Sequence, residues 1–137
     1  MAKTPRRLGQ VLAAAGFAAE VQTLTFVINN TTTADATFRL VRLPRKCKIR
    51  KVTYSQTANA TAVTSFTAQL QSATGPTSLT TALDIKLQGA NFSADMVLTA
   101  PGQIVPAGQV LQLVFDETGG TVTAPGYVGL AVEVQLL

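Results

Sequence analysis

The sequence predicts an all-β domain, a sandwich or barrel of about eight antiparallel strands, and three observations lead to this prediction. Threonine, a residue that favours strands, makes up 20 of the 137 residues. From residue 21 onward, apolar and polar side chains alternate in short segments, which is the period of a strand with one buried face. Turn residues such as Gly, Pro, Asn and Ser separate these segments. A chain of this length predicts a single domain with one core.

Strands are expected at eight places after residue 20. In the first of them, Leu24, Phe26 and Ile28 share the parity that points inward. The last one alternates without interruption from Val128 to Leu136, and its length and regularity place it inside a sheet instead of at an edge. The expected strands span residues 21–29, 36–43, 47–55, 63–71, 83–88, 95–99, 109–116 and 126–136.

The stretch PAGQVLQLVFDETGGTV, residues 106–122, contains the clearest of these strands. Leu111, Leu113 and Phe115 occupy one parity between two sets of turn residues. Proline presets φ and glycine tolerates positive φ, so the chain is expected to reverse at both ends. This pattern predicts that a hairpin partner follows the strand.

The chain divides into an N-terminal arm, residues 1–20, and a β-sandwich domain, residues 21–137. Thr4 and Pro5 suit the cap and first turn of a short helix that Gly16 can end. The apolar part of the arm is short and interrupted by glycine, which argues against a secretory signal peptide. A helix this short is marginal alone, so we expect the arm to dock onto its own sandwich or onto another subunit. The arm residues expected at a partner interface are Arg6, Arg7, Leu8, Val11, Leu12 and Phe17.

The absence of histidine excludes several classes of site. A Ser-His-Asp or Cys-His mechanism has no base, and a histidine-containing zinc site has no ligand. The seven carboxylates are scattered, and the adjacent Asp116 and Glu117 are expected to point to opposite faces of a strand, which makes a poor acid–base pair or chelate. No glycine-rich phosphate loop is present. We therefore expect no enzyme activity, no catalytic residue, no cofactor and no metal.

The single cysteine, Cys47, cannot form an internal disulfide, and two interpretations of it stay open. Its neighbours Lys46 and Lys48 would lower the pKa of the thiol and make it reactive. Alternatively, Cys47 is a small buried apolar residue at the start of a strand.

Positive charge is concentrated in the first part of the chain. Residues 1–51 carry ten Lys or Arg against two acids, a net charge of +8, whereas residues 52–137 carry one lysine against five acids, a net charge of −4. Only 13% of all residues are charged, which favours surfaces that neighbouring subunits cover; the alternative is a β-domain that is simply rich in threonine.

The segment RLVRLPRKCKIRK, residues 39–51, holds most of this excess. It suits contact with an acidic protein surface, contact with nucleic-acid phosphates, or a solvated edge whose charges discourage strand addition. Single-strand binding needs aromatic stacking platforms, and Tyr54 is the one ring nearby, so an acidic protein partner is favoured over nucleic acid. The basic residues expected to bind this partner are Arg39, Arg42, Arg45, Lys46, Lys48, Arg50 and Lys51.

Four segments, in their order along the chain, resemble the small jelly-roll decoration (cement) proteins of tailed-phage capsids. These segments are KIRKVTYSQTANATAVTSFTAQL, SLTTALDIKLQGANFSA, VPAGQVLQLVF and GYVGLAVEVQLL. The resemblance covers roughly residues 36–137 and consists of an arrangement of strands with an Ala-Gly turn, without an invariant reactive residue. It implies a jelly-roll-like antiparallel β-sandwich, commonly a homotrimer, that binds the capsid surface across capsomer junctions and stiffens the shell.

The expected function is that of a structural virion protein, made in the host cytoplasm, whose partners are the major capsid protein and copies of itself. A small coat, spike or fibre protein with a basic arm is the main alternative, and in a coat protein that arm faces packaged nucleic acid. A carbohydrate-binding module is disfavoured because tryptophan is absent and only eight Phe or Tyr residues are available. A nucleic-acid-binding module is a further alternative. No run of about 18 apolar residues occurs, so no membrane contact is expected.

Overall fold

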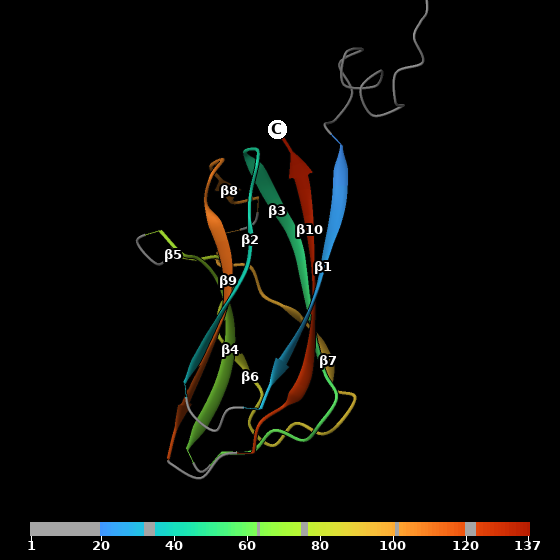
Figure 1. Cartoon of the computed structure of the whole chain (residues 1–137), viewed down its shortest axis with the longest axis vertical. Helices are drawn as coiled ribbons and strands as arrows, with labels where there is room; N and C mark the ends of the chain where they lie inside the picture. Colours follow the sequence, from blue (N-terminus) through green and yellow to red (C-terminus); the bar gives the residue numbers. More distant parts are fainter. Residues whose placement is uncertain (1–19, 32–34, 63, 75–76, 101, 120–122) are drawn as a thin grey trace, which may run out of the picture.

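The computed structural model of the chain describes residues 20–31, 35–62, 64–74, 77–100, 102–119 and 123–137. These residues form two antiparallel sheets that pack face to face, and no helix occurs among them (Figure 1). The predicted all-β sandwich is confirmed.

Each sheet contains five strands. The first sheet has the order β1–β10–β3–β7, and β8 also pairs with β3. Its strands are β1 (Val21–Asn30), β10 (Gly126–Leu136), β3 (Cys47–Gln56), β7 (Ser93–Met96) and β8 (Ile104–Val105). The second sheet has the order β2–β9–β4–β5, and β6 also pairs with β4. Its strands are β2 (Ala36–Arg42), β9 (Val110–Thr118), β4 (Ser65–Ser72), β5 (Thr77–Ser78) and β6 (Leu83–Asp84).

Consecutive long strands alternate between the two sheets. Strands β1 and β3 belong to the first sheet, β2 and β4 belong to the second, and the chain returns through β9 in the second sheet to β10 in the first. Each sheet therefore places a late strand beside early ones, which is the interleaving of a jelly roll. The jelly-roll-like architecture agrees with the expectation from the sequence.

Six of the eight predicted strands match a strand of the structure to within two residues at either end. The segment 83–88 contains only the two-residue β6, and the segment 95–99 is shifted to β7. Strands β5 and β8 were not predicted, since two residues are too few to show an alternation.

The prediction that a hairpin partner follows the strand in residues 106–122 is wrong. Strand β9 lies between β2 and β4, so both of its edges are already paired. The next strand, β10, crosses to the first sheet and lies between β1 and β3, inside the sheet as its regular alternation predicted. The turns themselves are present, and Gly108 and Gly119 adopt positive φ values of 86° and 108°.

The core lies between the inner strands of the two sheets. Phe115 on β9 is fully buried, and its ring meets Phe38 on β2 edge-on with centroids 5.8 Å apart. The ring of Phe66 on β4 lies 6.3 Å from the same Phe115 ring. These three rings join the neighbouring strands β2, β9 and β4 of the second sheet in one aromatic cluster, which packs into the core.

Candidate partner-binding surfaces

The predicted basic stretch, residues 39–51, is divided between the two sheets. Residues 39–42 belong to β2 in the second sheet, whereas residues 47–51 belong to β3 in the first. The chain passes from one sheet to the other between them. Its seven basic side chains are therefore spread over the second sheet, the connecting turn and the first sheet, and they do not form one patch.

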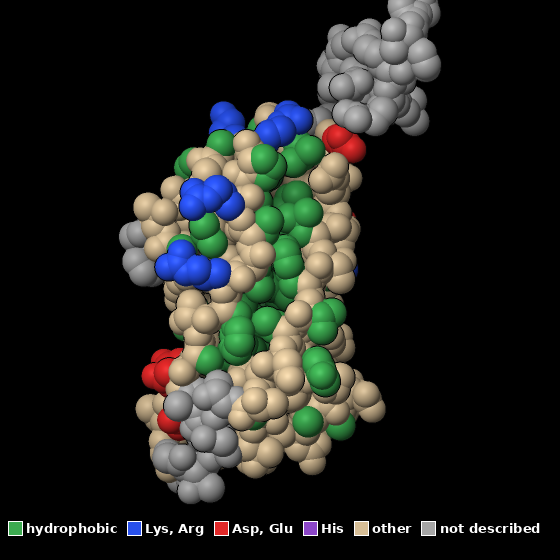
Figure 2. Space-filling model, viewed as in Figure 1, with side chains coloured by type: hydrophobic (Ala, Val, Ile, Leu, Met, Phe, Trp, Pro, Cys, Tyr) green, Lys and Arg blue, Asp and Glu red, His purple; other side chains and the backbone are tan. Residues whose placement is uncertain are grey.

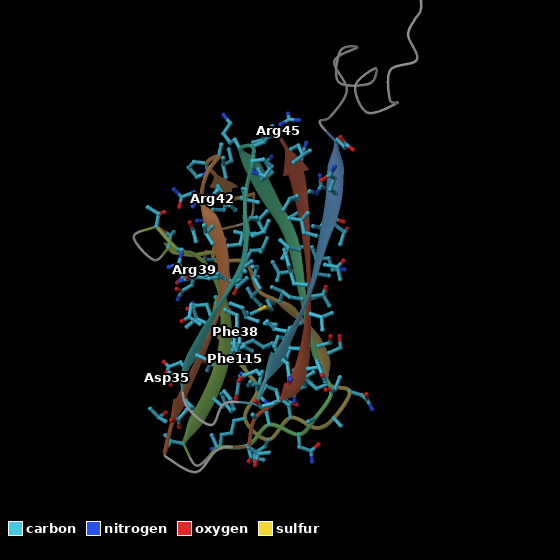
Figure 3. The ribbon with its side chains drawn as sticks, viewed as in Figure 1. Asp35, Phe38, Arg39, Arg42, Arg45 and Phe115 are labelled. Atoms are coloured by element: carbon cyan, nitrogen blue, oxygen red, sulfur yellow. The ribbon has the colours of Figure 1, made fainter. Side chains whose placement is uncertain are left out.

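A β-bulge places Arg39 and Arg42 on the same face. Residues three apart in a regular strand point to opposite faces, but the pairing of β2 with β9 shifts by one residue between Arg39 and Val41. Both arginines are exposed, while Leu40 and Val41 are half-buried. Arg45 follows on the turn beyond β2, and Figure 3 shows the three arginines one after another along this side of the molecule.

We call Arg39, Arg42 and Arg45 the arginine rim. Arg42 Nη1 donates a hydrogen bond to the carbonyl oxygen of Gly108 at 2.9 Å, and Arg45 Nη2 donates to the backbone oxygen of Leu137 at 3.0 Å. The two ion pairs found among the described residues include no arginine of the rim. Its positive charge is therefore available to an acidic partner.

Arg50 and Lys51 on β3, by contrast, have carboxylate neighbours. A second bulge, opposite Glu133 of β10, lets these consecutive residues both face outward. Arg50 Nε lies 3.6 Å from Glu133 Oε1. Lys51 Nζ lies 3.7 Å from Asp95 Oδ2 on β7. The outer face of the first sheet thus balances much of its own positive charge.

Lys46 and Lys48 differ in their surroundings. Lys46 is exposed in the turn before β3. Lys48 is half-buried and lines a shallow cavity of about 300 Å³ together with Arg50, Gly102 and Gln135. Neither lysine belongs to the arginine rim.

Cys47 is buried at the start of β3, which confirms the interpretation as a small core residue. Its Sγ donates a hydrogen bond to the carbonyl oxygen of Arg45 at 3.2 Å. Burial raises the pKa of the thiol, and the opposing effect of the Arg45 charge is smaller. The interpretation as a reactive thiol is therefore wrong, because desolvation outweighs the nearby positive charge.

Three acidic residues lie where β2 begins and β9 ends, with Asp116 and Glu117 on opposite faces of β9, and we call Asp35, Asp116 and Glu117 the acidic end. Asp35 Oδ1 accepts a hydrogen bond from the backbone nitrogen of Glu117 at 2.9 Å. Asp35 and Asp116 are exposed, whereas Glu117 Oε2 is buried and has no hydrogen-bond partner among the described residues. In the described part of the chain, no group of three His, Cys, Asp or Glu side chains could hold a metal ion.

An apolar trough runs between β1 and β2, where Figure 2 shows a band of hydrophobic side chains along the molecule. Strands β1 and β2 end the order of their sheets, and no described strand pairs with their outer edges. The trough deepens into a cavity of about 260 Å³ near the start of β1. This cavity is lined by Gln22, Leu24, Val41, Leu43, Pro44, Arg45, Cys47, Val134 and Leu136. Half-buried apolar residues along the trough are Leu24, Phe26, Ile28, Phe38 and Val41.

The sequence did not predict this trough. The inward parity of β1 was recognised, but whether a third strand covers the edge depends on the order of strands in each sheet. The predicted arm residues Arg6, Arg7, Leu8, Val11, Leu12 and Phe17 lie outside the described residues, which begin at Glu20. Within the described residues there is no helix of the length and apolarity needed to cross a membrane.

The sequence matches no protein-family model and no curated protein. The structure is similar to a chain of the cyanophage Pam1 capsid asymmetric unit, with a TM-score of 0.60 over 100% of this chain and 93% of that chain, at 16% identity. The two chains share a fold. A chain from infectious bursal disease virus, Gx strain, aligns with a TM-score of 0.41 over 88% of this chain and 34% of its own length, at 11% identity.

Proposed function

We propose that this chain is a structural virion protein that binds the outer surface of a phage capsid and stabilises the shell as a decoration protein. The observation that carries the proposal is the full-length likeness to a chain of a phage capsid asymmetric unit, which covers nearly all of both chains. The resemblance of residues 36–137 to cement proteins supports the same function. No enzyme activity and no cofactor are part of the proposal.

The mechanism is mechanical reinforcement. A decoration subunit buries surface against neighbouring capsid subunits, and many such modest interfaces act together on one particle. The low charged fraction of the chain, 13%, suits broad contact with protein neighbours. We propose the major capsid protein as the partner, a trimer as the assembled form and the capsid surface as the location.

The arginine rim is the surface that we assign to the capsid. Arg39, Arg42 and Arg45 have no Asp or Glu partner among the described residues, so pairing with an acidic capsid surface breaks no ion pair with an acidic side chain of this chain. Arg50 and Lys51 already face Glu133 and Asp95. Of the predicted basic residues, the rim is therefore expected to contribute most to attachment, with Lys46 beside it at the turn.

The test compares two sets of variants in co-sedimentation with capsid shells that lack this chain. We expect Arg39→Glu, Arg42→Glu and Arg45→Glu together to weaken attachment at least about a hundredfold, because reversed charges repel an acidic surface. The control, Arg50→Gln with Lys51→Gln, neutralises two basic residues outside the rim and is expected to change attachment less than about threefold. Circular dichroism establishes that both proteins are folded.

Two outcomes would count against this function. Equal attachment by both variants would remove the arginine rim from the interface. A wild-type chain that ignores shells but binds naked DNA with a steep dependence on salt would favour the nucleic-acid alternative.

A further inference from the structure

The apolar trough between β1 and β2 lacks a covering element among the described residues. Leu24, Phe26 and Ile28 on one side and Phe38 on the other are only half-buried, although each points toward the core. The backbones of both edge strands also face outward without a paired strand among the described residues. An extended segment with apolar side chains would satisfy both deficits at once.

We propose that this trough receives the arm of a second copy of the chain, with residues 8–17 lying along it. The proposal extends the function proposed above, because it assigns the arm to a sister subunit and leaves Arg39 and Arg42 of the arginine rim to the capsid, while Arg45 also lines the cavity at one end of the trough. Self-association through the arm does not itself require a capsid.

The length of the uncharged part of the arm matches the length of the trough. Residues 8–19 contain no charged side chain and include Leu8, Val11, Leu12 and Phe17. As an extended chain, residues 8–17 reach about 33 Å, which equals the span of the ten residues of β1. The helix expected from the sequence would span only about half of the trough, so the extended form fits better.

The charges also match in one direction. Asp35 of the acidic end directly precedes β2, which forms one wall of the trough, and Figure 3 shows it at the opposite end of β2 from Arg45. If Phe17 of the arm lies at the cavity, Leu8 lies near the other end of the trough. Arg6 and Arg7, which precede Leu8, then reach the acidic end. The buried Glu117 Oε2, which has no hydrogen-bond partner among the described residues, lies in the same group of carboxylates.

The start of β1 favours a second copy as the source of the arm. The backbone oxygen of Glu20 accepts a hydrogen bond from Leu136 at 2.9 Å, so the chain is already tied into the first sheet at this residue. Reaching the trough of the same chain would require a reversal directly before Glu20. The nearest residue of a type that favours such a turn is Gly16, and residues 17–20, Phe-Ala-Ala-Glu, contain no Gly, Pro, Asn or Asp.

A first experiment measures self-association of the purified chain without capsid, by sedimentation equilibrium. Deletion of residues 1–19 is expected to leave the sandwich folded, since its core is made by strands from β1 onward, and to raise the dissociation constant at least about a hundredfold. An unchanged dissociation constant would overturn the proposal. It would leave the proposed capsid binding standing, because that function is tested separately with the arginine-rim variants.

A second experiment distinguishes a sister copy from the same chain. In a Cys47→Ala background, chains with Ala15→Cys are mixed with chains that carry Gln22→Cys at the cavity, and a short bismaleimide cross-linker is added. The expected product is a cross-linked dimer of one chain of each kind. The matched control is Thr23→Cys, an exposed neighbour on the opposite face of β1, which is expected to give at least about tenfold less product.

Either of two results would overturn the proposal. A cross-link that forms only when Ala15→Cys and Gln22→Cys are in the same chain would show that the arm folds back on itself. Equal cross-linking at Gln22→Cys and Thr23→Cys would show that the arm has no place in the trough.

A charge exchange tests the direction of the arm. Asp116→Lys and Arg7→Glu are each expected to raise the dissociation constant about tenfold, and the double variant is expected to restore most of the loss. Asp95→Lys is a matched change outside the trough. Adding Arg7→Glu to it is not expected to lower the dissociation constant. Additive losses in the double variant Asp116→Lys with Arg7→Glu would contradict the pairing.

Discussion

Strands β9 and β10 alternate in sequence in the same way as β1 and β2, yet the two pairs differ in how well their inward faces are covered. Every inward side chain from Leu111 to Phe115 on β9, and from Val128 to Val134 on β10, is at most 1% exposed. The inward apolar side chains of β1 and β2, by contrast, are only half-buried; they include Leu24, Phe26, Ile28 and Phe38.

The difference comes from position in the sheet. An inner strand has a neighbour on each edge, and the opposite sheet covers its face. An edge strand lacks one neighbour, so the outer half of its inward side chains stays accessible. Alternation in a sequence thus shows which face points inward, but it does not show how completely that face is covered.

The largest expected effect tests the covered side of this comparison. Phe115→Ala removes a fully buried ring that contacts Phe38 and Phe66. We expect a loss of about 3–5 kcal/mol in the free energy of unfolding, measured by urea denaturation. A loss below about 1.5 kcal/mol would mean that the remaining side chains fill the space left by the Phe115 ring. Burial of the inward face would then contribute less to stability than we infer.

Phe38→Ala tests the uncovered side. Part of this ring is already accessible, so we expect a loss of about 1.5–2.5 kcal/mol in urea denaturation of the dilute, dissociated chain. At concentrations where the arm of a second copy fills the trough, the loss should become larger. A loss that is the same at both concentrations would argue that nothing covers Phe38 in the assembly.

Tyr54→Phe tests a polar contact on the covered side. The Tyr54 hydroxyl donates to Gln56 Oε1 at 2.9 Å, and both residues are buried, so we expect a loss of about 1 kcal/mol at pH 7. Burial raises the pKa of Tyr54 above the ordinary tyrosine value of 10.0. The unfolded chain therefore ionises first, and stability falls as the pH rises above about 10. Urea denaturation at pH 7 and at about 10.5 measures how far the free energy of unfolding falls between the two pH values. We expect a smaller fall for Tyr54→Phe than for the wild type, and an equal fall would exclude Tyr54 as the cause.

The smallest expected effect concerns the outer surface, where coverage has no role. Lys51→Gln breaks the ion pair between Lys51 and Asp95. The side chains of these two residues are 58% and 63% exposed. Because solvent screens such a pair, we expect a change of at most about 0.5 kcal/mol in the free energy of unfolding. Thermal unfolding at low and high salt would measure it, and a loss above about 1 kcal/mol would show that the outer face contributes more than the comparison allows.

Much of the fold could be predicted from local patterns. The alternation in residues 126–136 indicated an inner strand, and β10 does lie between β1 and β3. The partner of β9 could not be predicted in this way, because turn residues show that a chain reverses but not which sheet it enters. The two-residue strands β5 and β8 are held by their neighbours and have no periodicity of their own.

The candidate surfaces could be predicted only in part. The basic stretch was visible in the sequence, but two bulges decide which of its side chains share a face. One bulge aligns Arg39 with Arg42, and the other turns Arg50 and Lys51 outward together. A bulge changes the parity of a strand without a clear mark in the residue types, so strict alternation gives the wrong face beyond it.

The sequence by itself determined the class of fold, the position of the long strands and the inward parity of strands without a bulge, such as β1 and β10, because these depend on interactions between residues close in the chain. It also determined the excess of positive charge in residues 1–51. Only the tertiary structure decided that the basic stretch is divided between two sheets and that an apolar trough lies open between β1 and β2. It also decided that Arg50 and Lys51 lie beside carboxylate side chains, whereas the arginine rim has no Asp or Glu partner among the described residues. These features arise where residues distant in sequence come together, and such pairings depend on the order of strands, which no local pattern contains.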